Sequence, residues 1–241
     1  MKLVTWNIKQ GGTGSRFDSI ISHLLEHGAD LIILTEFWVG DEGDHIKKGL
    51  YDAGYIYQDI HTAPFKMDCV FAASKIPFQD VTDMNEYAVP YERWVDLYFP
   101  EKDLQVLGIH IPNTMIKLQD KEVFWQELIE YARKHKDGRC VIIGDYNTGL
   151  PEDTAGLKIE CLEYLKELNA MGWIDSWRYT HKDGKQVSWH SYSGQDWRID
   201  HAYISPSLSS QLVQCHYSHQ ERIDQSSDHS ALVIELNDKG K

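Results

Sequence analysis

The sequence predicts an α/β fold in which two packed β-sheets carry helices on their outer faces. Short apolar runs bounded by glycine or polar residues, such as residues 31–34 and 141–143, are typical of buried strands. Segments with apolar residues at helical spacing lie between these runs, and both halves of the chain follow the order strand, helix, strand and meander. No linker or low-complexity segment is visible, so residues 1–241 are expected to form one domain.

The elements are predicted from hydrophobic periodicity and turn signals. Strands are expected at residues 3–6, 31–34, 55–60, 69–74, 78–82, 94–99, 104–111, 141–143, 199–204, 212–216 and 231–236. Helices are expected at residues 15–27, 44–53, 116–136 and 157–171. Ser15 can cap the first helix, and Gly28 can end it. Residues 55–111 are expected to form an antiparallel meander, and residues 173–189 irregular structure.

Composition is that of an ordinary globular protein, with 42% hydrophobic and 12% aromatic residues. The four cysteines show no metal-type spacing and are expected to be free thiols in a reducing compartment. The N-terminus lacks a long apolar segment, and no later segment approaches a membrane span. These features predict a cytoplasmic location, no membrane association and no obligate protein partner.

The formal net charge is −13, from 24 basic and 37 acidic side chains. A broad polyanion-binding surface is disfavoured, because contacts to phosphates need lysine and arginine. A local phosphate site is still compatible with this charge where a bound divalent metal supplies the positive charge.

Polar side chains recur where the predicted strands end. Each has an ordinary explanation on its own, such as a turn, a solvated strand end or a satisfied core histidine. Because polar residues end the predicted strands in several separate segments, the pattern instead indicates a shared site. The residues are Asn7, Glu36, His110, Asp145, Asn147, Asp200, Asp228 and His229.

The composition of this set fits a magnesium site. Mg²⁺ prefers hard oxygen ligands, which Glu36, Asp228 and Asn7 would supply, and Mn²⁺ would be a substitute. There is no zinc-type cluster of cysteine and histidine and no phosphate-binding loop of the nucleoside-triphosphatase type.

The remaining polar residues suit hydrolysis of a phosphoester. Asp145 and Asn147 are two residues apart, are expected on the same side of their strand, and suit activating and orienting a water molecule. A histidine held by a carboxylate, His229 with Asp200, suits stabilising charge on a phosphoryl oxygen. The predicted reaction class is metal-assisted phosphoester hydrolysis.

Five sequence blocks together resemble the signature of the endonuclease/exonuclease/phosphatase superfamily, in matching order from residue 5 to residue 236. They are Thr5-Trp6-Asn7-Ile8, Leu34-Thr35-Glu36, Gly144-Asp145-Tyr146-Asn147, Trp197-Arg198-Ile199-Asp200 and Ser227-Asp228-His229. The further block Ser188-Trp189-His190-Ser191-Tyr192 is similar to one in the exonuclease III and AP-endonuclease branch.

The resemblance implies a four-layer α/β sandwich of the deoxyribonuclease I type, with two mainly antiparallel sheets flanked by helices and the site at one end. It implies that Asn7, Glu36 and Asp228 hold metal, that Asp145 and Asn147 handle the water, and that Asp200 orients His229. It also implies that His110 donates to a phosphate oxygen, with assistance from Asn113. Trp189, Trp197 and Arg198 are expected to contact substrate, although core packing is the more ordinary role for the two tryptophans, since tryptophan is commonly buried.

The chain departs from the repair enzymes in ways that bear on substrate. Thr35 replaces the glutamine usual in the second block, and the first block continues with Lys9-Gln10. Only residues 193–196 separate Tyr192 from Trp197, where the repair enzymes carry a longer loop.

The sequence therefore predicts a Mg²⁺-dependent phosphodiesterase with nuclease activity, acting on nucleic acid, with DNA ahead of RNA. The alternative is a phosphatase or phospholipase of the same superfamily that acts on a small phosphoester. A non-catalytic binding module is the third reading, and it is disfavoured because every expected catalytic position is filled.

Overall fold

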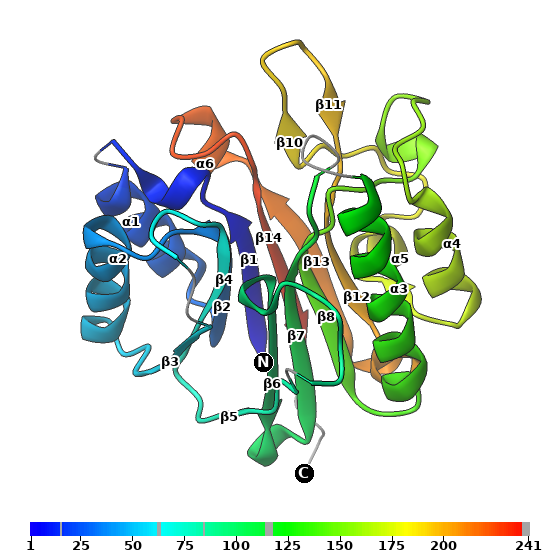
Figure 1. Cartoon of the computed structure of the whole chain (residues 1–241), viewed down its shortest axis with the longest axis horizontal. Coiled ribbons are helices and arrows are strands. Elements are labelled where there is room, and N and C mark those ends of the chain that lie inside the picture. The colour runs from blue at the N-terminus through cyan, green and yellow to red at the C-terminus, as the bar shows by residue number, and fades with distance from the viewer. Residues whose placement is uncertain (15, 62–63, 84, 114–117, 238–241) are drawn as a thin grey trace.

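Two six-stranded sheets lie face to face in the described part of the chain, and helices cover their outer faces (Figure 1). The computed structural model describes residues 1–14, 16–61, 64–83, 85–113 and 118–237. The first sheet has the order β13-β14-β1-β2-β4-β3, and the second has the order β5-β6-β7-β8-β12-β9. The predicted fold class, two sheets flanked by helices, is confirmed.

The strands of the first sheet come from both ends of the chain. They are β1 (Lys2–Asn7), β2 (Leu31–Phe37), β3 (Tyr57–Ile60), β4 (Cys69–Ser74), β13 (Leu212–Ser218) and β14 (Ala231–Leu236). The second sheet contains β5 (Gln79–Asp80), β6 (Trp94–Phe99), β7 (Leu104–His110), β8 (Cys140–Asp145), β9 (Ile174–Asp175) and β12 (Asp200–Ile204). A separate hairpin of β10 (Trp189–His190) and β11 (Asp196–Trp197) stands above the sheets (Figure 1).

The longer helices lie on the two outer faces. The α-helices are α1 (Phe17–His27), α2 (Asp41–Asp52), α3 (Leu118–His135), α4 (Leu162–Ala170), α5 (Ser176–His181) and α6 (Gln220–Ile223). Short 3₁₀ turns occur at η1 (Gln10–Gly12), η2 (Tyr91–Arg93), η3 (Pro100–Lys102), η4 (Pro151–Asp153) and η5 (Pro206–Gln211). Figure 1 shows α1 and α2 beside the first sheet and α3 and α4 beside the second.

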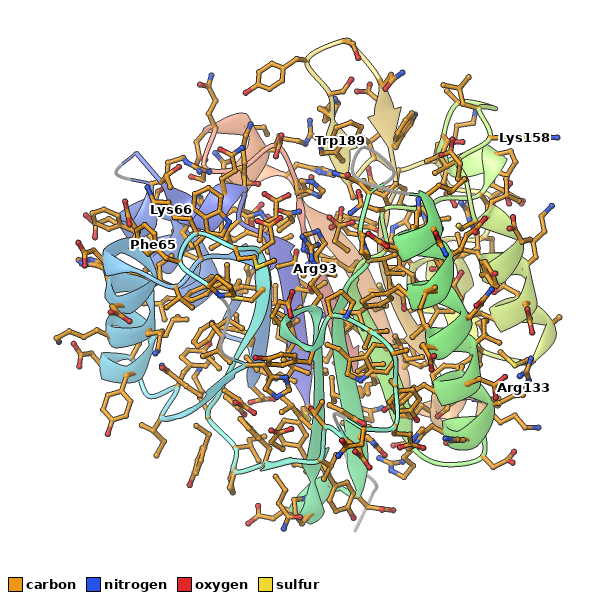
Figure 2. The ribbon with its side chains drawn as sticks, in the orientation of Figure 1. Phe65, Lys66, Arg93, Arg133, Lys158 and Trp189 are labelled. Atoms are coloured by element: carbon orange, nitrogen blue, oxygen red, sulfur yellow. The ribbon has the colours of Figure 1, made fainter. Side chains whose placement is uncertain are left out.

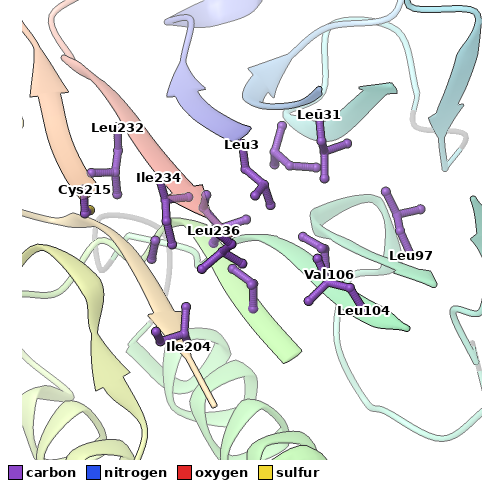
Figure 3. Close-up of a cluster of buried hydrophobic side chains, with 14 of the residues drawn as sticks. Leu3, Leu31, Leu97, Leu104, Val106, Ile204, Cys215, Leu232, Ile234 and Leu236 are labelled. Atoms are coloured by element: carbon purple, nitrogen blue, oxygen red, sulfur yellow. The ribbon is translucent and has the colours of Figure 1, made fainter. Parts of the chain in front are cut away.

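Alternation along the strands divides the apolar side chains among three cores. In β2, Leu31 and Ile33 face the other sheet, whereas Ile32 and Leu34 pack with the helices. The inter-sheet core draws residues from strands of both sheets, including Leu3 of the first and Ile204 of the second (Figure 3). Because both faces of each central strand are covered, such strands are continuous apolar runs. This shared core supports the prediction of a single domain, which stays a prediction.

Each sheet contains one parallel pair of neighbours, β1 with β2 and β7 with β8. A helix connects each pair, α1 in the first sheet and α3 in the second, as parallel neighbours require a crossover. The carboxyl ends of a parallel pair lie at the same edge of the sheet, and here both pairs end where Asn7 and Asp145 are in hydrogen-bond contact. The architecture thus brings four strand ends to one place.

The predicted meander over residues 55–111 is wrong as a single unit. Strands β3 and β4 join the first sheet, whereas β5, β6 and β7 join the second. Local turn signals locate strands, but the choice of pairing partner depends on packing between distant segments.

Two predictions for residues 157–189 are also wrong. The helix expected at residues 157–171 begins only at Leu162, after Cys161 adopts a left-handed φ of 69°. Residues 173–189 are not irregular throughout, because β9 and α5 lie within them. The Asp175 side chain caps α5 by accepting from the Trp177 and Arg178 backbone N–H groups.

The second helix begins at Asp41, three residues ahead of the expected residue 44. The Ser15 cap and the expected start of the third helix at residue 116 lie outside the described residues. In the chain as described, no helix combines the length and apolar character needed to cross a membrane.

Candidate active site

The centre of the site is a row of three side chains across neighbouring strands. Asp145 ends β8, and the register pairs it with His110 of β7 on one side and with Asp200 of β12 on the other. Residues paired across neighbouring strands point to the same face of a sheet. All three side chains are buried.

Glycine is required immediately before Asp145. Gly144 has a φ of 150°, and a Cβ atom there would lie 1.9 Å from the Ile109 carbonyl oxygen. Only a residue without a side chain permits this approach of β8 to β7. The glycine therefore allows Asp145 to reach the end of the row.

Glu36 is directed by a bulge at the end of β2. The pairing of β2 with β4 shifts register between Leu34 and Phe37, and Glu36 adopts a left-handed φ of 51°. Bulges near active sites re-aim side chains, and a left-handed conformation is strained for residues other than glycine. The Glu36 carboxylate accepts hydrogen bonds from the Gln10 backbone N–H at 2.7 Å and from Asn7 Nδ2 at 3.0 Å.

Asn7 links the two sheets. Its Nδ2 donates to Glu36 Oε1 at 3.0 Å and to Asp145 Oδ2 at 2.9 Å. Its Oδ1 accepts from the Lys9 backbone N–H at 2.9 Å. One amide thus holds a carboxylate from each sheet at a fixed separation.

His229 forms a buried pair with Asp200, whose Oδ2 lies 2.9 Å from His229 Nδ1. Burial disfavours the charged imidazolium, but the Asp200, Asp145 and Asp228 carboxylates outweigh burial and raise the pKa of His229 to about 10. His229 is therefore a cation near neutral pH. It is held in place by the carboxylate that it pairs with.

Asp145 has an environment that raises its pKa. Burial and the nearby Asp200 charge raise the pKa of the Asp145 carboxyl to about 7, against the lowering effect of His229, Asn7 and the Asn147 N–H. A carboxylate with a pKa near neutrality is a suitable general base.

Asn147 reaches the site through a turn. The strand ends at Asp145, and Asn147 has a left-handed φ of 47°. Its backbone N–H donates to Asp145 Oδ1 at 2.8 Å, a turn typical of aspartate. The two side chains were expected on one side of an extended strand, but it is this turn that brings both to the pocket.

His110 is a neutral donor held by Arg93. Burial and the positive charges of Arg93 and His229 hold the pKa of His110 well below its ordinary value. Arg93 Nη1 lies 2.9 Å from His110 Nδ1, and a guanidinium can only donate. The ring proton must therefore be on Nε2, which lies 3.9 Å from Asp145 Oδ2 and is free to donate into the site.

Arg93 is itself anchored by an acidic partner. Its Nη2 donates to Asp68 Oδ2 at 3.0 Å, and Asp68 Oδ1 accepts from Trp38 Nε1 at 2.6 Å. Figure 2 shows Arg93 near the centre of the view and Trp189 above it, toward the hairpin. The contact between Asp68, Arg93 and His110 joins three separate segments.

A pocket of about 710 Å³ opens over these strand ends. Among its lining residues are most of those expected in the site, namely Glu36, Asn113, Asp145, Asn147, Trp189, Trp197, Asp228 and His229. Asn7, His110 and Asp200 lie directly behind this lining, in contact with it. Trp189 and Trp197 belong to the hairpin, with ring centroids 5.3 Å apart, and are only partly buried. They therefore form a wall of the pocket instead of packing within the core.

Arg198 does not reach this pocket, so the expected substrate contact is not supported. Its side chain is fully buried and forms bidentate contacts with Asp153, at 2.8 and 2.9 Å. It also donates to both carboxylate oxygens of Asp175, at 3.2 and 2.6 Å. Arg198 and Asp200 belong to one sequence block but point to different surroundings, and Arg198 has a structural role.

Sequence reasoning missed three cationic residues of the site. Lys121 is buried, its Nζ donates to the Asn147 carbonyl at 2.6 Å, and burial lowers its pKa. Its signal was present, since it falls on the apolar face of α3 with Phe124, Trp125 and Leu128. Lys9 pairs with Asp228 at 3.0 Å, and neither this contact nor that of Arg93 has a local sequence signal.

Oxygen donors suited to a hard divalent cation surround the pocket. Glu36 and Asp228 supply carboxylates to the pocket. In Asp228, the ion pair with Lys9 involves Oδ2 and not Oδ1. Asp145, Asp200 and His229 form a second group whose ligand atoms lie within 4.8 Å of one another. His229 Nδ1 already forms a hydrogen bond with Asp200, and this bond would have to break before the nitrogen could coordinate a metal. The donor set as a whole fits a cation that prefers oxygen.

Solved structures share this fold over nearly the whole chain. A 3′-5′ exonuclease from Neisseria meningitidis matches with a TM-score of 0.82 at 21% identity, covering 98% of this chain and 100% of that one. An AP endonuclease from Archaeoglobus fulgidus and a Neisseria 3′ phosphatase bound to a product DNA hairpin each match with a TM-score of 0.82 at 20% identity, covering 98% of this chain and 99% of theirs.

Sequence comparison leads to the same group of proteins. An exodeoxyribonuclease from Bacillus subtilis is 25% identical over 259 aligned residues, which cover 98% of this chain and 100% of the relative. The model of the endonuclease/exonuclease/phosphatase family matches residues 4–229, a span that includes all the strand ends described above. The chain therefore belongs to the endonuclease/exonuclease/phosphatase family.

Proposed function

We propose that this protein is a Mg²⁺-dependent phosphodiesterase that cleaves nucleic acid, with DNA ahead of RNA. The observation that carries the proposal is the convergence of Asp145, His110, the His229–Asp200 pair and Glu36 on one pocket. This set combines a base near neutrality, a cation, a neutral donor and oxygen ligands, which are the groups that hydrolysis of a phosphodiester needs.

Asp145 accepts a proton from the attacking water. Its carboxylate is held from both sides, by Asn7 Nδ2 at 2.9 Å and by the Asn147 N–H at 2.8 Å, so it has little freedom to turn away from the pocket. The pKa of about 7 gives a useful fraction of the carboxylate at neutral pH together with sufficient basicity. The Asn147 side chain lines the same pocket and orients the water or a phosphate oxygen.

The two histidines serve the phosphate oxygens in different charge states. His229 is the cation of the His229–Asp200 pair and stabilises negative charge that develops in the transition state. His110 is neutral and donates a hydrogen bond from Nε2, because Arg93 occupies its other nitrogen. Asn113, at the exposed edge of the pocket, assists in substrate contact.

The cation is assigned to Glu36, with Asn7 and Asp228 as further oxygen donors. Mg²⁺ matches this set because it prefers carboxylate and amide oxygens and a partly hydrated shell, and Mn²⁺ can substitute. When bound, such an ion polarises the phosphoryl group and neutralises charge on its oxygens. Asn7 would contribute through Oδ1, whose second lone pair remains after the hydrogen bond from Lys9.

The related proteins support nucleic acid as the substrate. Their names describe an exodeoxyribonuclease, an AP endonuclease and a 3′ phosphatase with product DNA. Trp189 and Trp197 supply an aromatic wall against which a nucleobase or deoxyribose can pack.

A phosphatase or phospholipase activity on a small phosphoester is the second candidate. The net charge of −13 and the short connection at residues 193–196 favour it, because both reduce contact with a long polyanion. The same catalytic residues would serve either substrate.

The cytoplasmic location also stays a prediction.

The test is a metal-dependent cleavage assay with the wild-type protein and Asp145→Asn. Substrates are single- and double-stranded DNA, abasic-site duplex, RNA and bis(p-nitrophenyl) phosphate. Polymer cleavage that requires Mg²⁺ and falls at least about 1,000-fold in the variant is expected, since the base is lost in a nearly isosteric change. Hydrolysis of the small diester alone would move the function to small phosphoesters, and wild-type activity in the variant would refute the assignment of Asp145.

A further inference from the structure

A second pocket adjoins the catalytic one and shares a wall with it. Its volume is about 520 Å³, and Lys9, Tyr192 and Asp228 line both pockets. Arg16 and Arg222 lie in the lining of the second pocket only. We call it the flanking pocket. A ligand that extends out of the catalytic pocket past these shared residues enters it directly.

The flanking pocket is positively charged in an acidic protein. Lys9, Arg16 and Arg222 bring three cationic side chains to it, and Asp228 is its single carboxylate among the described residues. The chain as a whole has a net charge of −13. A local excess of positive charge against this background marks a place suited to an anion.

The two arginines have no carboxylate partner in the part of the chain that the structure describes. Arg222 donates from Nε to Ser230 Oγ at 3.2 Å, and its Nη2 lies 3.4 Å from His219 Nδ1. Among the described residues, the Arg16 guanidinium donates to main-chain carbonyls, those of Ile8, Lys9, Thr13 and Ser226. Neither guanidinium forms a direct ion pair among these residues; the Asp228 and Glu36 charges act on Arg16, and the Asp196 charge on Arg222, from a longer distance. Both arginines can therefore still attract a phosphate.

The flanking pocket is fixed relative to the catalytic residues. Arg16 ties the loop after β1 to the Ser226 carbonyl, and Ser227 Oγ donates to the Asn7 carbonyl at 2.7 Å. Asp228 and His229 follow directly in the chain. These contacts hold the two pockets at a constant separation, as successive phosphates of one strand would require.

Tyr192 adds an exposed aromatic ring beside the charged pocket. It lies between β10 and β11 at the tip of the hairpin that stands above the sheets (Figure 1), and it is 97% exposed. Lys9 Nζ donates to its hydroxyl at 3.0 Å and lies 4.8 Å from the ring centroid. The ring is thus positioned by a cation while remaining open to solvent. Cations that follow a backbone, combined with exposed rings on which bases stack, are the features by which proteins bind single strands.

We propose that the flanking pocket and Tyr192 form a subsite for the nucleotide next to the scissile phosphate in a single-stranded nucleic acid. Lys9, Arg16 and Arg222 take the neighbouring backbone phosphate, and the base stacks on Tyr192. This inference rests on the proposed nuclease function and specifies the form of its substrate.

Binding and cleavage are measured separately, so that failure of the subsite and failure of the proposed function can be told apart. Binding of a fluorescent single-stranded oligonucleotide is followed by anisotropy in the Asp145→Asn background, with Arg222→Gln or Tyr192→Ala added. Two matched controls are Arg133→Gln, which removes one positive charge from an exposed ion pair on α3, and Tyr192→Phe, which keeps the ring. Cleavage of the oligonucleotide and of bis(p-nitrophenyl) phosphate is measured in parallel for the wild-type protein and for the single variants Arg222→Gln and Tyr192→Ala.

Arg222→Gln is expected to weaken binding about fivefold or more and to make the slope of log affinity against log salt shallower by about 0.7, the contribution of one phosphate of a single strand. Tyr192→Ala is expected to weaken binding by about fivefold or more, and Tyr192→Phe much less. Arg222→Gln should leave kcat/KM for the small diester within about twofold of wild type, because Arg222 lines the flanking pocket and not the catalytic one, and that substrate does not reach the subsite.

Unchanged oligonucleotide binding in Arg222→Gln, or equal effects of Arg222→Gln and Arg133→Gln, would overturn the phosphate assignment. Equal binding by Tyr192→Ala and Tyr192→Phe would overturn the stacking assignment. Failure of the wild-type protein to cleave any nucleic acid, with the binding differences intact, would instead count against the proposed function and leave the subsite supported.

Discussion

Replacing Arg198 with methionine removes a buried cation from between two carboxylates. Arg198 is fully buried and donates to both oxygens of Asp153 and of Asp175 at 2.6–3.2 Å. Methionine retains much of the apolar volume of the side chain, so the change tests mainly the charge. Without the guanidinium, two carboxylates that are 4% and 8% exposed lose their shared partner.

The expected loss of stability depends on the ion pairs and hydrogen bonds that each carboxylate retains. Breaking a buried ion pair by removing one partner costs about 3–5 kcal/mol. Asp153 keeps Arg178, and Asp175 keeps two backbone N–H groups at the start of α5, so the lower end applies. We expect a loss of about 3 kcal/mol in the free energy of unfolding, which lowers Tm by about 6–12 °C in a chain of this size.

Thermal unfolding and steady-state kinetics test this together. Arg198→Met should lower Tm, and adding Asp153→Asn and Asp175→Asn should recover part of the loss, because the unpaired charges are then gone. Well below the lowered Tm, KM for nucleic acid should stay within about twofold of wild type. An unchanged Tm with a KM raised tenfold would refute the reasoning and restore Arg198 as a substrate-binding residue.

Three further predictions concern the site and the core. Arg93→Met should lower kcat by about 10–100-fold, because His110 loses the donor that fixes its tautomer. Arg93→Lys should retain more activity. Equal kcat values for the wild type and Arg93→Met would contradict this prediction. Glu36→Gln should raise by about tenfold or more the Mg²⁺ concentration that gives half-maximal stabilisation in a thermal-shift titration, and an unchanged titration would exclude it as a ligand. Burial raises the pKa of Asp96 to about 7 from an ordinary value of 3.8, so its contribution to stability is present below about pH 4 and is lost as the pH rises through 7. In urea unfolding measured across this pH range, the free energy of unfolding of Asp96→Asn should fall less than that of the wild type, by up to about 4 kcal/mol. Parallel plots of unfolding free energy against pH for the two proteins would contradict this prediction.

The residues that carry the proposed chemistry were recognisable in the sequence because their signals are local. A buried strand followed by Gly144 and Asp145 specifies both the strand and the carboxylate at its end. The structure brings Asp145, Asp200 and His229 together as expected, with the His229–Asp200 pair at 2.9 Å. Strand positions were predictable for the same reason, since alternation and turn residues depend on a few neighbouring positions.

The pairing of strands and of charges was decided by the tertiary structure. Nothing local indicated that the strands of the expected meander divide between two sheets, because a strand selects its partner through packing with distant segments. The late start of α4 has a similar origin. Residues 157–160, predicted as helix, instead line the catalytic pocket.

The charged residues of the site show the same division between local and long-range information. Asp145 and His229 were predicted as site residues from their blocks, whereas the partners of Arg198 and Arg93 were not predicted. Arg198 lies in a recognisable block yet is buried against Asp153 and Asp175, and Arg93 follows no motif yet sets the protonation of His110. Sequence determines which residue types follow each strand, but ion pairs and tautomers depend on distances of a few ångströms between segments far apart in the chain, and only the fold sets these distances.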